Sequence, residues 1–161
     1  MEGQLIDSPR QDRELSRRLR KYDLIRMDPG GTAAKVRAGS KLSLKTSKET
    51  FDIELTPHDL RAPDYVAQVI GDDGIVRKLP KAPVNTFKGR VKGSERAQAR
   101  MTVTDGGIEG AIITDANQYF LQPARDLSST AKNDEFVFYE ASDLTGESVS
   151  CGVTLADEVA A

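Results

Sequence analysis

Hydrophobic and polar residues alternate with a period of two over much of the chain. The segments 41–45 (Lys-Leu-Ser-Leu-Lys) and 51–55 (Phe-Asp-Ile-Glu-Leu) are the clearest examples. A strand with one buried face shows this alternation, because successive side chains point to opposite faces of a sheet. We therefore predict a half-buried strand in each segment.

Short apolar runs continue at a spacing typical of antiparallel sheets. They cover residues 65–70, 75–79, 86–92, 99–104, 108–114, 118–122 and 135–139. Clusters of Asp, Gly, Pro and Asn, which favour turns, separate several of them, at residues 28–31, 71–74, 105–107 and 115–117. Residues 69–76 and 101–108 each have the pattern of a hairpin. Strands and turns this short leave no room for the long crossovers of a parallel sheet, so we predict an all-β fold, an antiparallel β-sandwich or partly closed barrel.

The two ends of the chain have a different character from the middle. Residues 1–20 are polar and rich in arginine, with Leu15 and Leu19 spaced by four, which is compatible with a polar arm or a short helix. Residues 141–150 are rich in Ser, Thr, Asp and Gly. We expect an N-terminal arm over 1–20, the β domain over 21–140, and a linker with a flexible C-terminal tail over 141–161.

Composition and charge limit the classes of protein to consider. The chain has 161 residues, enough for one domain with a core of its own. The net charge of −2 argues against nucleic acid as the main partner. The charge is uneven, with 12 Lys and Arg against 7 Asp and Glu in residues 1–50, but one Lys against eight acids in residues 126–161. We expect no membrane segment, because no apolar stretch approaches the roughly 18 residues that a span requires. The sequence also begins without the profile of a secretory signal, which by itself suggests a cytosolic protein.

Reactive residues are scarce. His58 is the only histidine and Cys151 the only cysteine. The two-histidine motif of a zinc protease and a three-histidine metal site are therefore both excluded within this chain. His58 follows a predicted strand, where a surface turn residue is the ordinary interpretation. A nucleophilic pair of Cys151 and His58 would make a thiol enzyme, which is the least favoured hypothesis.

Cys151 stands ten residues from the end of the sequence, in Ser150-Cys151-Gly152-Val153-Thr154. A single cysteine cannot form an intramolecular disulfide. Its surroundings are polar, whereas a cysteine that only fills space usually lies in a core. A tethered thiol is well suited to bind a metal or to react, so we treat Cys151 as the leading candidate site residue.

Several segments, taken in order, resemble the prodomain of ADAM and reprolysin (adamalysin-type) zinc metalloproteases. They are residues 22–26, 51–55, 86–91, 105–110, 119–123 and 151–154, the last reading Cys-Gly-Val-Thr. The resemblance covers most of the chain, from Tyr22 to Thr154. Asn85 or Thr86, and Asp105 or Gly106, stand where the family often has a pair of cysteines, so the family's disulfide is absent. This departure suits a bacterial relative.

The resemblance implies a non-catalytic, secreted prodomain that inhibits a protease and assists its folding. A metalloprotease catalytic domain is expected C-terminal to it in the same precursor, with the secretory leader outside the sequence given. Cys151 as thiolate would bind the catalytic zinc of that domain, and Gly152, Val153 and Thr154 would contact the protease cleft. No cofactor is expected within this chain. The alternative is a secreted β-sandwich binding module for a glycan or protein ligand, with an incidental cysteine.

Overall fold

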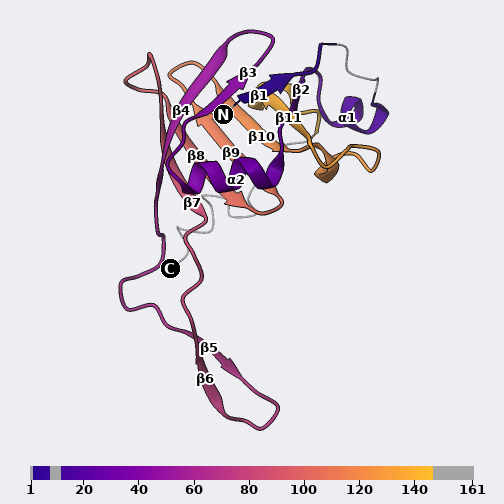
Figure 1. The fold of residues 1–161 in the computed structure, drawn as a ribbon. Coiled ribbons are helices and arrows are strands. Elements are labelled where there is room, and N and C mark those ends of the chain that lie inside the picture. The colour runs from indigo at the N-terminus through magenta and orange to yellow at the C-terminus, as the bar shows by residue number, and fades with distance from the viewer. Residues whose placement is uncertain (1, 8–11, 147–161) are drawn as a thin grey trace, which may run out of the picture.

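Nine strands close into a barrel in the computed structural model, which describes residues 2–7 and 12–146 (Figure 1). Around the barrel they are β1 (Glu2–Leu5), β2 (Asp23–Arg26), β11 (Glu135–Glu140), β10 (Gln118–Pro123), β9 (Gly107–Ile113), β8 (Gln98–Thr104), β7 (Thr86–Val91), β4 (Thr50–Pro57) and β3 (Leu42–Lys45). The predicted all-β fold is confirmed. Of the two predicted architectures the barrel is observed, and it is closed rather than partly closed. Every strand predicted from the hydrophobic pattern is present, with bounds within two residues of those expected.

Alternating side chains fill the barrel. Phe51, Ile53 and Leu55 of β4 are buried, whereas Glu54 between them is exposed. They belong to one apolar cluster with inward side chains of the other barrel strands, such as Val103 of β8. Burying this face provides the main driving force for folding, and the period of two fixes the register of each strand.

The first strand closes the barrel, and the hydrophobic pattern did not predict it. β1 pairs antiparallel with β2 on one side and parallel with β3 on the other. Gly3 lies in the wall so tightly that a Cβ atom there would come within 2.8 Å of Ile25 and 3.0 Å of Leu44. The expected N-terminal arm over 1–20 therefore includes a barrel strand, which four residues of weak pattern did not reveal.

Helix α2 (Pro29–Arg37) occupies the stretch whose first residues were interpreted as a turn. Asp28 caps the helix by accepting a hydrogen bond from the Gly31 amide at 3.1 Å, and proline stands in the first turn. An Asp-Pro pair has the composition of a turn but is equally a helix start, because proline lacks the amide that the first turn leaves unpaired. Ala33 and Val36 then pack into the barrel core, which decides in favour of the helix.

Helix α1 (Arg13–Arg18) covers the outside of the barrel and confirms the short helix considered for this region. Leu15 and Leu19 join a second apolar cluster with Val137 and Tyr139 of β11. β11 is therefore buried on both faces, because Phe136 and Phe138 point into the barrel. This explains why residues 135–139 read as a nearly continuous apolar run rather than an alternating one.

The hairpin of β5 (Ala67–Ile70) and β6 (Val76–Leu79) stands outside the barrel (Figure 1). β4 pairs directly with β7, so residues 58–85 form an excursion between two neighbouring strands. The hairpin predicted over 69–76 is confirmed, with Gly74 at φ +73° in its turn. We call residues 58–85 the arm.

Candidate functional site

The predicted site residues Cys151, Gly152, Val153 and Thr154 lie outside the described residues. The chain that leads to them is described as far as residue 146. After β11 a short 3-10 helix, η2, covers Ala141–Asp143. Thr145 then donates its amide hydrogen to the carbonyl oxygen of Arg18 at 2.8 Å, and the Arg20 amide donates to Asp143 at 2.8 Å.

These contacts change the interpretation of the predicted linker over 141–161. Leu144 forms a bridge with Leu19 at the end of α1, so the first five residues of the predicted linker are fastened to the barrel. The Thr145 hydroxyl also donates to the carbonyl oxygen of Arg17, but backbone hydrogen bonds and a single hydroxyl leave no periodic pattern in the sequence. Cys151 follows Thr145 by six residues, and six residues span at most about 20 Å.

A pocket opens at the same end of the barrel, with a volume of about 380 Å³. Its lining comes from the start of β2, the β3–β4 turn, the end of β11 and Asp143 of η2. Phe51, Tyr119 and Phe138 also line it, and their ring centroids lie 5.3 to 5.5 Å apart. The pocket combines an aromatic surface with a charged rim, which is the usual composition of a small-molecule site.

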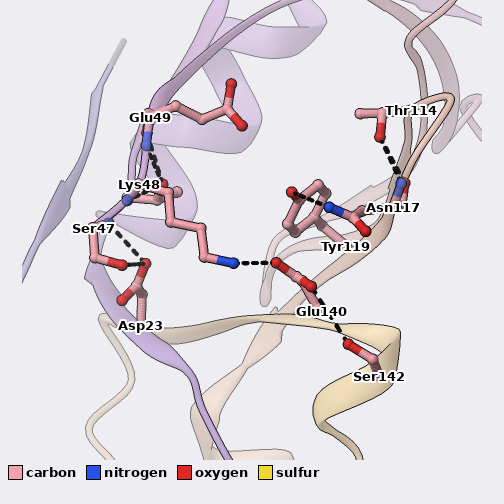
Figure 2. A network of polar contacts seen from close by, with 10 residues as sticks. Asp23, Ser47, Lys48, Glu49, Thr114, Asn117, Tyr119, Glu140 and Ser142 are labelled. Atoms are coloured by element: carbon pink, nitrogen blue, oxygen red, sulfur yellow. Dashed lines mark hydrogen bonds and ion pairs between the residues drawn. The ribbon is translucent and has the colours of Figure 1, made fainter.

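An ion pair crosses the rim of the pocket (Figure 2). Lys48 of the β3–β4 turn donates to the carboxylate of Glu140 at the end of β11, and Ser142 donates to the other oxygen of the same carboxylate. The Glu140 side chain is only 16% exposed, whereas Lys48 is 65% exposed. The hydrogen bond from Lys48 lowers the pKa of Glu140, and the same bond raises the pKa of Lys48. Both groups therefore stay charged across the neutral range.

The turn that carries Lys48 is itself held in place. Asp23 of β2 accepts hydrogen bonds from the amide and the hydroxyl of Ser47, at 2.8 and 2.9 Å (Figure 2). On the far side of the pocket Asn117 donates to the Tyr119 hydroxyl at 3.1 Å. The rim is thus built from side chains of strands distant in sequence. Alternation predicts that Phe51 and Tyr119 point inward, but no sequence signal brings them together, because their strands are not neighbours in the sheet.

His58 lies at the other end of the barrel, where β4 ends and the arm begins. Its amide donates to Thr86 at 2.8 Å, and the Thr86 hydroxyl donates back to the His58 carbonyl. These bonds extend the pairing of β4 with β7 by one residue, rather than forming a turn, and give His58 a structural position at the base of the arm. Across residues 2–7 and 12–146, no three His, Cys, Asp or Glu side chains are grouped so that they could hold a metal ion.

Most of the exposed large hydrophobic side chains of the described residues lie in the arm. Eight of its large hydrophobic side chains are exposed: Leu60, Tyr65, Val66, Val69, Ile70, Ile75, Val76 and Leu79. Only Ile113 and Leu144 are exposed in the same way elsewhere among the described residues. The sequence predicted both strands correctly but not their departure from the barrel. Pro63, Pro80 and Pro83, which flank the two strands, are the signal in the sequence that marks the excursion.

Comparisons with known proteins leave the family open. No family model matches the chain, and no curated protein is significantly similar to it. None of the described helices is long and apolar enough to cross a membrane.

Proposed function

We propose that this chain is the inhibitory and folding-assisting prodomain of a secreted zinc metalloprotease. The observation that carries the proposal is the position of its single cysteine. Cys151 follows Thr145 by six residues, and Thr145 is hydrogen-bonded to Arg18 at the end of α1, which packs on a closed barrel. The order of motifs that resembles the reprolysin prodomain, ending in Cys-Gly-Val-Thr, supports the same assignment.

The chemistry required of Cys151 is ligand substitution. A catalytic zinc held by three protein ligands keeps a fourth position for the water that attacks the substrate. The Cys151 thiolate would take that position and so exclude the water. Zinc binding removes the thiol proton, so no basic neighbour is needed to generate the thiolate. Gly152 would let the backbone approach the cleft closely, with Val153 and Thr154 following along it.

The barrel contributes by keeping the thiol close to its target. A second contact joined by a short linker acts at an effective concentration of roughly millimolar. A modest thiolate–zinc interaction then keeps the protease latent while the rest of the prodomain is docked. Thr145 is held against α1, and Cys151 follows it by six residues.

The test is inhibition of the cognate catalytic domain by the separate chain. We expect the native chain to inhibit, Cys151→Ser to inhibit at least tenfold more weakly, and the neighbouring control Ser150→Ala to match the native chain. In a cobalt-substituted protease the native chain should add a thiolate-to-metal absorption band that Cys151→Ser does not give. Equal inhibition by the native chain and Cys151→Ser, without the band, would refute the zinc-ligand mechanism.

The pocket at the barrel end favours a second candidate function, a binding module for a small ligand such as a glycan. Aromatic side chains beside charged groups can stack on one face of a ligand while polar groups orient it. Titration of the isotope-labelled chain with a panel of mono- and oligosaccharides tests this function. Binding should shift the ring resonances of Phe51, Tyr119 and Phe138 and leave those of the arm unchanged. A panel that shifts none of them would exclude a glycan from this pocket.

A further inference from the structure

The arm has no partner within the described chain. Its two strands pair only with each other, and the described barrel strands pair only among themselves. A two-stranded ribbon is at best marginally stable in water when it packs against nothing. Exposed apolar patches of this extent mark interaction sites in soluble proteins. The unsupported ribbon carries five of the eight exposed hydrophobic side chains of the arm, so we expect a partner to cover it.

The two legs of the arm are tied together at the base. Arg61 donates to the carboxylate of Asp59 at 2.7 Å and to the carbonyl oxygen of Ala82, on the opposite leg, at 2.7 Å. Lys81 also pairs with Asp59, at 3.1 Å. These contacts keep the two legs side by side, so the arm leaves the barrel as one element (Figure 1).

Apolar side chains lie on both faces of the ribbon. Residues directly opposite each other in the hairpin share a face, so Ile70 and Val76 lie on one face with Gln68 and Lys78. Val69 lies on the other face with Ala67, Leu79 and Arg77. A flat surface would bury only one face, whereas a groove buries both. Residues 58–85 contain four Lys and Arg and four Asp, so the arm has no net charge to steer it. An apolar groove with a polar rim therefore suits the arm better than a flat or charged surface.

The arm begins at the opposite end of the barrel from Thr145, which precedes Cys151 by six residues. β4 begins at the β3–β4 turn, which lines the pocket, and ends at Pro57, where the arm begins. Its eight residues span about 26 Å. Cys151 can lie up to about 20 Å from Thr145. A catalytic domain of about 200 residues has a radius of gyration near 16 Å and is roughly 40 Å across. A partner of that size can lie along the side of the barrel and contact both the cysteine segment and the arm.

We propose that the arm docks into an apolar groove of the protease catalytic domain and supplies a second contact, separate from the zinc site. This inference rests on the proposed prodomain function and names the surface through which the prodomain would hold its enzyme. Residues 60–79 alone approach the roughly 20 to 30 residues that each partner contributes to a standard interface. Cys151 would then block the zinc, while the arm supplies much of the affinity.

The test uses the two most exposed apolar residues of the arm. Leu60 and Ile70 are 72% and 70% exposed, so Leu60→Ser with Ile70→Ser should leave the fold intact, as circular dichroism and thermal unfolding can verify. Ile113→Ser is the matched control, because Ile113 is 44% exposed on barrel strand β9. We expect the double variant to raise the inhibition constant at least tenfold, and the control to leave it within twofold.

Hydrogen exchange gives a readout independent of inhibition. Amides of residues 67–79 should exchange more slowly when the native chain is bound to the catalytic domain. The same protection should appear with Cys151→Ser, which separates the arm contact from the zinc contact. If the native chain inhibits but the double variant inhibits equally and the arm is not protected, the arm inference is wrong and the prodomain function stands. If the native chain neither inhibits nor binds the catalytic domain, both fail. A dimer of the native chain that the double variant dissociates would instead assign the arm to a second copy.

Discussion

Asp12 connects α1 to the loop after η1 (Ala124–Asp126) and gives the sharpest stability prediction. One carboxylate oxygen caps α1 by accepting from the amides of Glu14 and Leu15, at 3.0 and 3.2 Å. The other accepts from the hydroxyls of Ser128 and Thr130, at 2.6 and 3.2 Å. Asp12 and Ser128 are both buried, so removing the carboxylate leaves a buried hydroxyl without this partner.

The expected cost of Asp12→Ala follows from these two sets of bonds. Loss of a helix cap costs about 1 kcal/mol. Loss of a hydrogen bond to a charged group costs about 1.5 to 3 kcal/mol. Together they predict a loss of about 3 kcal/mol in the free energy of unfolding, or roughly 6 to 12 °C in Tm for a chain of this length. Asp12→Asn should fall between Asp12→Ala and the native chain, because asparagine caps a helix as well as aspartate does.

The pH dependence of the same variants checks the role of the charge. Burial alone would raise the pKa of Asp12, but hydrogen bonds from Ser128, from the first-turn amides and from Thr130 outweigh it and lower the pKa. A carboxyl whose pKa is lowered by folding stabilises the protein above its unfolded pKa of about 4, and this contribution is lost as the pH falls further. The difference between the native chain and Asp12→Asn should therefore shrink between pH 5 and pH 2.

Urea unfolding followed by far-ultraviolet circular dichroism measures these differences, since the chain has no tryptophan. Asp72→Ala is the control, because Asp72 is exposed in the turn of the arm and should change stability by less than about 0.5 kcal/mol. If Asp12→Ala and Asp72→Ala have the same unfolding midpoint, Asp12 does not hold α1 against the loop after η1.

Three further predictions address the barrel, the pocket and the arm. Gly110→Ala should lower the unfolding midpoint strongly, because a Cβ atom would meet a backbone oxygen at 2.0 Å. Gly39→Ala should cost less, because only a positive φ of +82° opposes the side chain there. Similar midpoints of the two variants in a thermal melt would contradict this. Lys48→Met should raise the pKa of Glu140 toward its ordinary value, since the hydrogen bond from Lys48 is the main cause of the lowered pKa. The titration of Glu140 can be followed by NMR of its carboxyl carbon. An unchanged pKa in the variant would show that the ion pair does not form in solution. Brief trypsin treatment should cut first within the arm, whose exposed ribbon is the least supported part of the described chain; mass spectrometry showing first cleavage in the barrel would count against an unsupported arm.

The sequence was most informative where one face of a strand is buried. Period-two alternation located β3 and β4 closely, because a shift of one residue would move their apolar side chains into water. The alternation could not predict β1, because its four residues include Gly3, which packs into the barrel wall but adds no apolar side chain to the pattern. Nor could it separate barrel strands from the arm, since β5 and β6 have ordinary strand propensity and differ only in what surrounds them.

The pocket and the contact between Thr145 and Arg18 could not be predicted from the sequence, for a related reason. Phe51, Tyr119 and Phe138 come from three strands, and their meeting depends on how the barrel closes. The contact between Thr145 and Arg18 uses backbone atoms, which every residue carries. Contacts of these kinds follow from the fold as a whole and leave no local pattern to detect.

The hydrogen bond between Thr145 and Arg18 limits the reach of Cys151 more than it changes the effective concentration of the thiol. Measured from Glu140, the end of β11, the chain to Cys151 would be eleven residues, whereas from Thr145 it is six. Loop-closure entropy depends on the logarithm of length, so this shortening is worth only about 0.5 kcal/mol, or roughly twofold to threefold in effective concentration. The change in reach is larger, from roughly 37 Å to about 20 Å. The bridge between Leu19 and Leu144 therefore acts mainly by limiting how far Cys151 can lie from the end of α1. If the chain is a prodomain that also docks through the arm, its enzyme must lie within reach of both Thr145 and the arm.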